Sequence, residues 1–280
     1  MEKNIAIIFA GGTGQRFGAE IPKQFIRIYG KEIIVQTLEK FQNHPEIDEI
    51  YIGCIDEWIP YLEHLLNKYN ITKVPKDGIV GGGNTGQDTI YKILSKAREY
   101  NTDDAIVLIN DGVRPNITDR EIHENIQSVK ENGSAITCIP FQETPVLSID
   151  GKHVEATLDR KQLYRGVAPQ SFRLGHILDA HHLIRENDPL YEMNYNGSRI
   201  VDSASLMTAA FGEKCAIVEG NPNNIKVTNM DDFFSQLGLM QKDDIANYFM
   251  AQNNQMSMNE SLQYGQRLSE GNESQKGRKK

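Results

Sequence analysis

The feature that most constrains this chain is a glycine-rich run directly after its first strand-like segment. Residues 3–10 are mostly apolar and lead into AGGTGQRFG at residues 10–18. Glycines at the end of a buried strand let backbone N–H groups approach an anion closely. A tight turn would account for two glycines, but four glycines with Arg16 among them favour a phosphate-binding loop.

Strand-like and helical segments alternate over the first half of the chain. Strand-like runs at residues 3–10, 48–55, 105–110 and 134–140 are separated by helical apolar spacing at 32–42, 58–69, 87–100 and 118–131. In the last of these helices, Thr118 and Glu121 have the spacing of a capping box. The alternation predicts an α/β fold with a doubly wound, mostly parallel Rossmann-like sheet, which binds ligands at the carboxyl ends of its strands.

The alternation stops after residue 140. Residues 144–149 and 152–158 read as two strands joined by Asp150-Gly151, a two-residue hairpin signal. We therefore expect a protruding β-hairpin arm over residues 141–163. Further helices (175–186, 202–211 and from 231) and strands (215–219 and 224–228) return to the core. Residues 1–240 are expected to form one domain, and residues 241–280 a helix end followed by a polar, disordered tail.

Composition excludes several classes of protein. The net charge of −8 argues against a nucleic-acid partner. No apolar run approaches the roughly 18 residues of a membrane span, and only six apolar residues follow the charged start, too few for a secretory signal. Cys54, Cys138 and Cys215 are far apart in apolar runs, so free thiols are expected. Together these features predict a cytoplasmic protein without a membrane partner.

The glycine loop does not match two common nucleotide motifs. No Gly-Lys pair follows it, so it is not a Walker loop. The G-x-G-x-x-G fingerprint fails because Phe17 occupies the last glycine position, which argues against an NAD-dependent oxidoreductase. Lys23, after the rigid Pro22, adds a second cation, and two fixed cations beside a phosphate suit phosphoryl or nucleotidyl transfer. Taken alone, Lys23 would fit a solvated surface equally well.

Six segments, in chain order, resemble motifs of the CTP-dependent cytidylyltransferases that act on 2-C-methyl-D-erythritol 4-phosphate and ribitol 5-phosphate. The first is the glycine loop with Pro22-Lys23-Gln24. The others are residues 82–89 (GGNTGQDT), 110–115 (NDGVRP), 159–160 with 168–172 (APQSF), 201–205 (VDSAS) and 224–228 (NIKVT). The resemblance covers residues 3–240 and implies the nucleotide-diphospho-sugar transferase type of the α/β fold.

The resemblance also implies a role for individual residues. It implies catalytic roles for Arg16, Lys23, Arg160 and Lys226; nucleotide binding by Ala10, Gly11, Gly12, Thr13, Gly14, Gly82, Gly83, Asn84, Asp88 and Thr89; and acceptor binding by Asp111, Arg114, Thr144 and Asp202. The arm would cross to a partner subunit, which implies a homodimer, although the hairpin could instead pack on its own sheet. A long exposed hairpin is only marginally stable by itself, which favours the dimer.

Several of these residues also have an interpretation from local chemistry. Asp111 follows a buried strand and would suit Mg²⁺ beside a triphosphate, or would simply cap the turn into Gly112. Asp88 stands where a helix N-cap is expected. Lys226 lies in a strand-like segment, where an inward lysine needs an anionic partner. The adjacent His181 and His182 face different directions on a helix, so a solvated face is expected rather than a metal site.

The sequence departs from the family pattern at three positions. Asn110 stands where the family has His, Gly86 where it has Arg, and Ala168 where it has Thr. A nucleotide-binding regulatory protein without activity is therefore an alternative. The favoured prediction is transfer of CMP from CTP to a polyol phosphate, with Mg²⁺ as cofactor. Residues 35–41 and Trp58 resemble the ribitol phosphate enzymes more than the methylerythritol ones, which implies ribitol 5-phosphate as the acceptor. Methylerythritol phosphate is the alternative.

Overall fold

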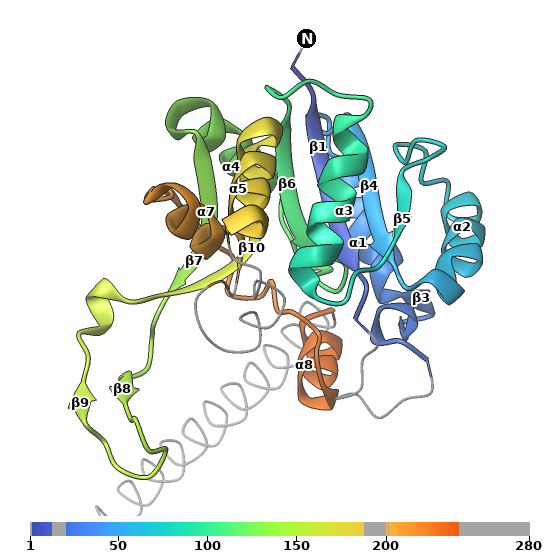
Figure 1. Cartoon of the computed structure of the whole chain (residues 1–280). Coiled ribbons are helices and arrows are strands. Elements are labelled where there is room, and N and C mark those ends of the chain that lie inside the picture. Colours follow the sequence, from blue (N-terminus) through green and yellow to red (C-terminus); the bar gives the residue numbers. More distant parts are fainter. Residues whose placement is uncertain (1, 13–20, 188–199, 201, 241–280) are drawn as a thin grey trace, which may run out of the picture. The chain divides into compact units, whose positions relative to one another are not determined.

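The computed structural model describes residues 2–12, 21–187, 200 and 202–240 (Figure 1). The chain divides into two compact units, Met1–Asp232 and Phe233–Lys280. Helix α8 (Met230–Met240) begins in the first unit and ends in the second. The site described below lies wholly in the first unit. The predicted tail at 241–280 is outside the described residues.

A seven-stranded sheet forms the centre of the first unit in the part of the chain that the structure describes. Its strand order is β11-β7-β10-β6-β1-β4-β5. The strands are β1 (Asn4–Ala10), β4 (Glu49–Cys54), β5 (Ile79–Gly81), β6 (Ile106–Asp111), β7 (Ser134–Pro140), β10 (Tyr164–Arg173) and β11 (Ile217–Glu219). Only β10 runs antiparallel to its neighbours among these strands. The prediction of a mostly parallel sheet is therefore confirmed.

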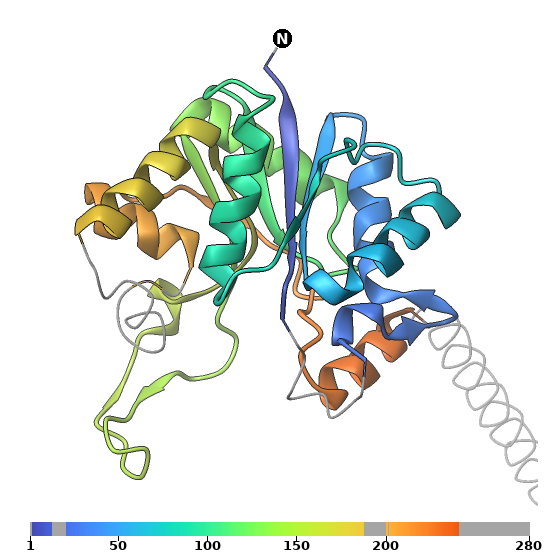
Figure 2. The ribbon, with the colours of Figure 1, turned by 45° about the vertical axis from the view of Figure 1, so that its right-hand side comes forward.

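Helices cover both faces of this sheet (Figure 2). One layer contains α1 (Ile33–Asn43), α2 (Ile59–Lys68) and α4 (Asp119–Asn132), and the other α3 (Gly86–Arg98), α5 (Leu174–Asn187) and α7 (Ser203–Phe211). Successive side chains of a strand point to opposite faces. Ala6 and Ile8 of β1 accordingly join the first core and Ile5 and Ile7 the second. The fold is thus doubly wound, as predicted.

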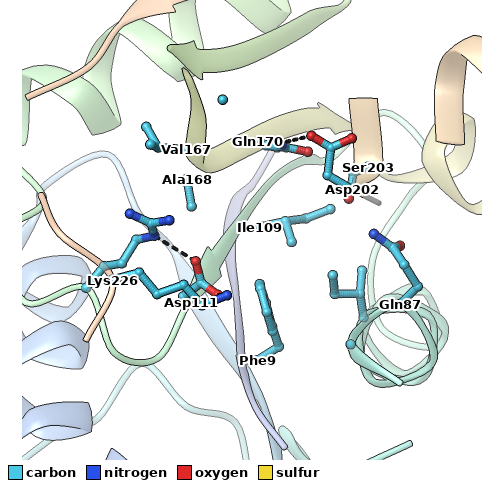
Figure 3. Close-up of a pocket in the computed structure, with 14 residues that line it drawn as sticks. Phe9, Gln87, Ile109, Asp111, Val167, Ala168, Gln170, Asp202, Ser203 and Lys226 are labelled. Carbon is cyan, nitrogen blue, oxygen red and sulfur yellow. Dashed lines mark hydrogen bonds and ion pairs between the residues drawn. The ribbon is translucent and has the colours of Figure 1, made fainter. Parts of the chain in front are cut away.

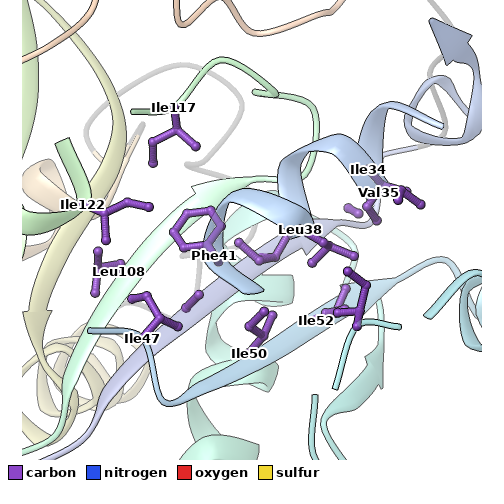
Figure 4. Packing of buried hydrophobic residues seen from close by; sticks show 14 of the residues in the cluster. Ile34, Val35, Leu38, Phe41, Ile47, Ile50, Ile52, Leu108, Ile117 and Ile122 are labelled. Atoms are coloured by element: carbon purple, nitrogen blue, oxygen red, sulfur yellow. The ribbon is translucent and has the colours of Figure 1, made fainter. Parts of the chain in front are cut away.

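The first core shows how the apolar spacing of the sequence becomes packing. Leu38 and Phe41 of α1 lie on Ile50 and Leu108 of the sheet and are fully buried (Figure 4). Residues three apart share one face of a helix, so the same spacing that predicted α1 delivers both side chains to the sheet. No helix in the described ranges is long and apolar enough to span a membrane.

The ends of α4 follow the predicted chemistry. The Thr118 side chain accepts a hydrogen bond from the Glu121 backbone N–H, and the Glu121 carboxylate accepts one from the Thr118 backbone N–H, so the capping box is present. The helix ends at Gly133, whose φ of +78° favours glycine.

The structure differs from the predicted strands at three places: two strands were missed, and one predicted strand does not form. β10 was not predicted, because Gly166, Ala168 and Pro169 interrupt its sequence, and its register shifts between Gly166 and Gln170. β5 was also missed. Residues 224–228 do not form a strand in the described structure. Val227 donates one backbone hydrogen bond to Val113, and no strand ladder follows.

The arm has less regular structure than predicted. β8 (Val146–Leu147) pairs with β9 (Ala156–Thr157), and Figure 1 shows both extending away from the sheet. The prediction of a two-residue turn was wrong, because the connection between β8 and β9 runs from residue 148 to residue 155. The Asp150 carboxylate accepts hydrogen bonds from the Lys152 and His153 backbone N–H groups, which closes a local turn instead of extending the ladder.

Candidate active site

The glycine loop leaves β1 beside the segment that carries Lys23. Ala10, Gly11 and Gly12 are described; Thr13, Gly14 and Arg16, which the sequence assigned to the same loop, lie outside the described residues. The Gln24 side chain donates a 2.6 Å hydrogen bond to the Ala10 carbonyl. This buried contact ties the short 3₁₀ helix η2 (Lys23–Phe25) to the end of β1, and so brings Lys23 to the pocket lined by Gly11 and Gly12.

The second glycine-rich segment packs on the first turn of α3. The Thr89 hydroxyl accepts a 2.9 Å hydrogen bond from the Gly83 N–H and donates one of 3.0 Å to the Thr85 carbonyl. A Cβ at Gly83 would lie 2.3 Å from the Cβ of Asp88, so only glycine fits. Gly82 also lies against Gly11. The two predicted nucleotide-binding segments, at residues 10–12 and 82–89, therefore meet at the carboxyl ends of β1 and β5.

Asp88 is not the N-cap of α3. The cap is Thr85, whose hydroxyl accepts a 3.1 Å hydrogen bond from the Asp88 N–H, and the helix begins one residue earlier than predicted. The Asp88 carboxylate instead forms an ion pair with Arg185 of α5, whose guanidinium lies 4.3 Å from the centre of the Tyr91 ring. Sequence reasoning missed Arg185, because it is 97 residues away and no spacing connects the two.

Asp111 is the electrostatic centre of the site. It is the last residue of β6 and is buried. One of its oxygens lies 2.7 Å from the Arg114 Nε and the other 2.6 Å from the Lys226 Nζ. Burial by itself would raise the pKa of Asp111, but the positive charges and hydrogen bonds of Lys226 and Arg114 outweigh it and hold that pKa below its usual range. The predicted anionic partner of Lys226 is thus Asp111.

Arg114 is fixed by a second contact. Its Nη1 donates a 2.8 Å hydrogen bond to the carbonyl of Asn224, and the residue is buried. Two residues further on, the Lys226 ammonium lies 5.8 Å from the centre of the Phe9 ring. The irregular segment at 224–228 therefore both orients Arg114 and delivers a second cation to Asp111, although it is not the predicted strand.

Two pockets adjoin at this carboxylate. The first, of about 450 Å³, is lined by the glycine segments together with Lys23. The second, of about 180 Å³, lies between α3, β6, β10 and α7. Phe9, Gly86, Asp111 and Lys226 line both. A ligand in each pocket would therefore meet the other beside the same pair of opposite charges.

Asp202 lies in the second pocket (Figure 3). It is the N-cap of α7, because one carboxylate oxygen accepts a 2.8 Å hydrogen bond from the Ser205 N–H. The other oxygen accepts a 2.9 Å hydrogen bond from the Gln170 side chain. Asp202 is thus held rigidly at the pocket wall opposite Asp111, with Ser203 beside it.

Four of the predicted site residues that the structure describes line neither pocket: Gly82, Asp88, Thr144 and Arg160. Thr144 and Arg160 are exposed on the arm and line neither pocket. The Arg160 guanidinium donates a 2.8 Å hydrogen bond to the Gln142 carbonyl, across the base of the hairpin. Apolar side chains are also exposed along the arm: Phe141, Val146, Leu147, Ile149, Val154 and Leu158.

The described residues do not fit a resident Mg²⁺ ion. Asp111 is the predicted ligand, but both of its oxygens already contact cationic nitrogens. Within the described ranges, no group of three or more His, Cys, Asp or Glu residues comes together. Mg²⁺ takes oxygen ligands and is repelled by neighbouring guanidinium and ammonium groups.

His181 contradicts the expected solvated face. It is fully buried on α5, with its ring 5.5 Å from that of Tyr91, and neither ring nitrogen has a hydrogen-bond partner among the described residues. Burial first, and then the neighbouring charge of Arg185, lowers the pKa of His181 to about 3. The ring is therefore neutral and acts as part of the core.

The strand ends of this sheet bring a glycine-lined pocket and a second polar pocket together at one buried carboxylate. That arrangement is typical of an α/β enzyme that binds two ligands at the carboxyl ends of its strands. A family model described as IspD, 2-C-methyl-D-erythritol 4-phosphate cytidylyltransferase, matches residues 4–241. The chain belongs to this family of CTP-dependent nucleotidyltransferases.

Known relatives agree with this assignment. A ribitol-5-phosphate cytidylyltransferase of Streptococcus agalactiae is 43% identical over 232 residues, which cover 82% of this chain and 92% of the relative. A 2-C-methyl-D-erythritol 4-phosphate cytidylyltransferase of Clostridioides difficile is 35% identical and covers 86% and 96%. The crystal structure of 4-diphosphocytidyl-2C-methyl-D-erythritol synthase from Anaerococcus prevotii has the same fold, with a TM-score of 0.67 at 24% identity over 86% of this chain and 96% of that one.

Proposed function

We propose that this protein transfers CMP from CTP to ribitol 5-phosphate, with CDP-ribitol and pyrophosphate as products. The observation that carries the proposal is the pair of adjoining pockets that share Asp111 and Lys226. CTP would occupy the glycine-lined pocket with its phosphates near Lys23. The acceptor would occupy the second pocket with its phosphate beside Arg114 and Lys226.

The reaction needs positioning more than proton transfer. An oxygen of the acceptor phosphate forms a bond to the α-phosphorus of CTP. The bond from that phosphorus to the oxygen that bridges to the β-phosphorus breaks, and pyrophosphate leaves with this oxygen and its electron pair. The attacking oxygen is already anionic, so no strong base is required. Lys23 and Arg16 would neutralise charge on the nucleotide phosphates, while Asp111 holds Lys226 and Arg114 toward the acceptor.

The choice of acceptor is supported by the relatives. The relative named for ribitol 5-phosphate is 43% identical to this chain, and the one named for methylerythritol phosphate is 35% identical. The second pocket also carries Gln87, Gln170, Asp202 and Ser203, which suit a ligand with several hydroxyl groups. Methylerythritol phosphate remains the alternative acceptor.

We further propose a cytoplasmic homodimer in which the arm of one subunit reaches the acceptor pocket of the other. Thr144 and Arg160 would then contact the partner's acceptor. The exposed apolar side chains of the arm support this arrangement, because a monomeric protein seldom exposes so many apolar side chains in one segment. Mg²⁺ would enter with CTP, bound by phosphate oxygens and water.

The experiment that tests the function is pyrophosphate release from CTP with a panel of acceptors: ribitol 5-phosphate, methylerythritol 4-phosphate and glycerol 3-phosphate. We expect the highest kcat/KM with ribitol 5-phosphate. A higher value with methylerythritol 4-phosphate would assign the alternative activity. CTP binding without pyrophosphate release in the presence of any of the acceptors would instead identify a regulatory protein that has lost catalysis.

A further inference from the structure

Gln87 is a buried residue whose side-chain oxygen lacks a hydrogen-bond partner among the described residues. It is the second residue of α3 and only 2% exposed. Its Oε1 has no hydrogen-bond partner in the described part of the chain. The residue lines the second pocket, and Figure 3 shows its side chain pointing from α3 toward Asp202 and Ser203.

A buried amide oxygen without a hydrogen-bond partner destabilises a folded protein, because it has lost its contact with water and gained nothing in return. The neighbouring amide of Gln170 has no such deficit. Its Oε1 accepts a 3.1 Å hydrogen bond from the Ala204 N–H, while its Nε2 donates to Asp202. Gln170 is therefore fixed by the protein, whereas Gln87 is left for a ligand.

The distribution of charge in the second pocket indicates which kind of ligand would fit it. Cations lie at one side, where Arg114 and Lys226 flank Asp111. Ile90, Ile109 and Val167 form apolar walls, and Gln87, Asp202 and Ser203 supply polar groups. A molecule with a phosphate at one end and hydroxyl groups along its carbon chain matches this order. Because an amide presents a donor or an acceptor after a 180° rotation, it suits a hydroxyl, which can be both.

We propose that Gln87 binds a hydroxyl group on the carbon chain of the acceptor and thereby selects polyol phosphates over shorter alcohol phosphates. This inference rests on the proposed function, since it assumes that the acceptor lies in the second pocket. It assigns a specificity-determining role to a residue that lies within the motif at residues 82–89 but to which the resemblance assigned no role.

The test compares Gln87→Met with Gln36→Met. Met has a similar length to Gln and no hydrogen-bonding amide. Gln36 is a matched control: it is also a buried helical glutamine, but it donates to the Ile28 and Lys31 carbonyls and lines neither pocket. For each variant we would measure the KM of CTP, kcat/KM with ribitol 5-phosphate, and the Ki or KM of glycerol 3-phosphate, which is two carbons shorter.

We expect Gln87→Met to lower kcat/KM with ribitol 5-phosphate by about tenfold, the size of one lost hydrogen bond. The KM of CTP and the constant for glycerol 3-phosphate should stay as in the wild type, and Gln36→Met should change none of the three. An equal loss with both acceptors, or a change in the KM of CTP, would overturn the role of Gln87.

The wild-type acceptor panel separates this inference from the proposed function. If the wild type prefers methylerythritol 4-phosphate, the proposed function fails, and the same pair of variants is then compared on that acceptor. A selective loss in Gln87→Met would still support hydroxyl binding by Gln87, and an unchanged kcat/KM would refute it.

Discussion

Lys23 lines the same pocket as Gly11, Gly12 and Gly83, and the residue after it is tied to β1 by a side-chain hydrogen bond. Gln24 anchors the turn through the Ala10 carbonyl, and Lys23 faces the glycine segments next to it. In nucleotidyl transfer, negative charge builds on the transferred phosphorus and on the leaving oxygen, so a fixed cation there acts mainly on the transition state.

We predict that Lys23→Ala lowers kcat by about 100-fold, the size typical of one lost transition-state donor. Thermal unfolding should be almost unchanged, because Lys23 is not part of the core. Initial rates of pyrophosphate release test the predicted loss of kcat, and the melting temperature tests the predicted stability. Near-normal turnover would contradict the assigned role.

His181 predicts a dependence of stability on pH. The folded ring has a pKa of about 3, below the ordinary value of 6.5. The unfolded chain therefore binds more protons between these values, so stability is lost as the pH falls from about 6.5 toward 3. Between pH 7.5 and 5, His181→Leu should remove about 2 kcal/mol of the wild-type loss in unfolding free energy. Urea unfolding of both proteins at both pH values measures the difference. If the unfolding free energy changed equally with pH in the wild type and in His181→Leu, the buried, neutral ring would be contradicted.

At the scale of elements, the arm carries two residues to which the family resemblance assigns acceptor binding or catalysis. Thr144 and Arg160 line neither pocket of the described structure, and the two strands beyond Thr144 pair over only two residues each. Such a short ladder adds little stability by itself. These observations agree with the proposal that the arm packs on a partner subunit.

We predict that Arg160→Ala raises the KM of the acceptor by about tenfold or more, as expected for a lost charged hydrogen bond, and spares the KM of CTP. Lys161→Ala, at the neighbouring exposed position of the short helix η4 (Arg160–Gln162), is the matched control and should behave as the wild type. A similar rise in both constants for Arg160→Ala would contradict the arm model.

The helices and the parallel strands other than β5 were predictable to within about two residues, because buried faces impose a regular apolar spacing on α1, α4 and β6. β10 was not, because Pro169 and its neighbours lack the alternation of a strand; its place comes from pairing with β6 and β7. In the site, Asp111 and Lys226 were predictable from local chemistry and family motifs. The pairing of Asp88 with Arg185 depends on how α3 packs on α5, which no local pattern encodes.

At the scale of the whole molecule, the described residues of the candidate site lie within the family match at residues 4–241. We propose that residues 1–240 form the catalytic domain and that the tail is not needed for catalysis. A chain that ends at Gln252 should therefore keep the kcat and both KM values of the full chain. The comparison uses purified proteins of equal folded content by circular dichroism. A folded but inactive shortened chain would show that the tail contributes to the site.

The ion pair between Asp111 and Lys226 has a consequence for how the protein is made. Lys226 is about 115 residues after Asp111 in the chain. At a translation rate of about 5–20 residues per second, Lys226 is therefore synthesised on the order of ten seconds after Asp111. The strands β1, β4, β5 and β6 are complete by then, so the nucleotide half of the sheet can assemble while its buried carboxylate still lacks one of its two cations. A nascent chain therefore completes the charged side of the second pocket only after Lys226 has been synthesised.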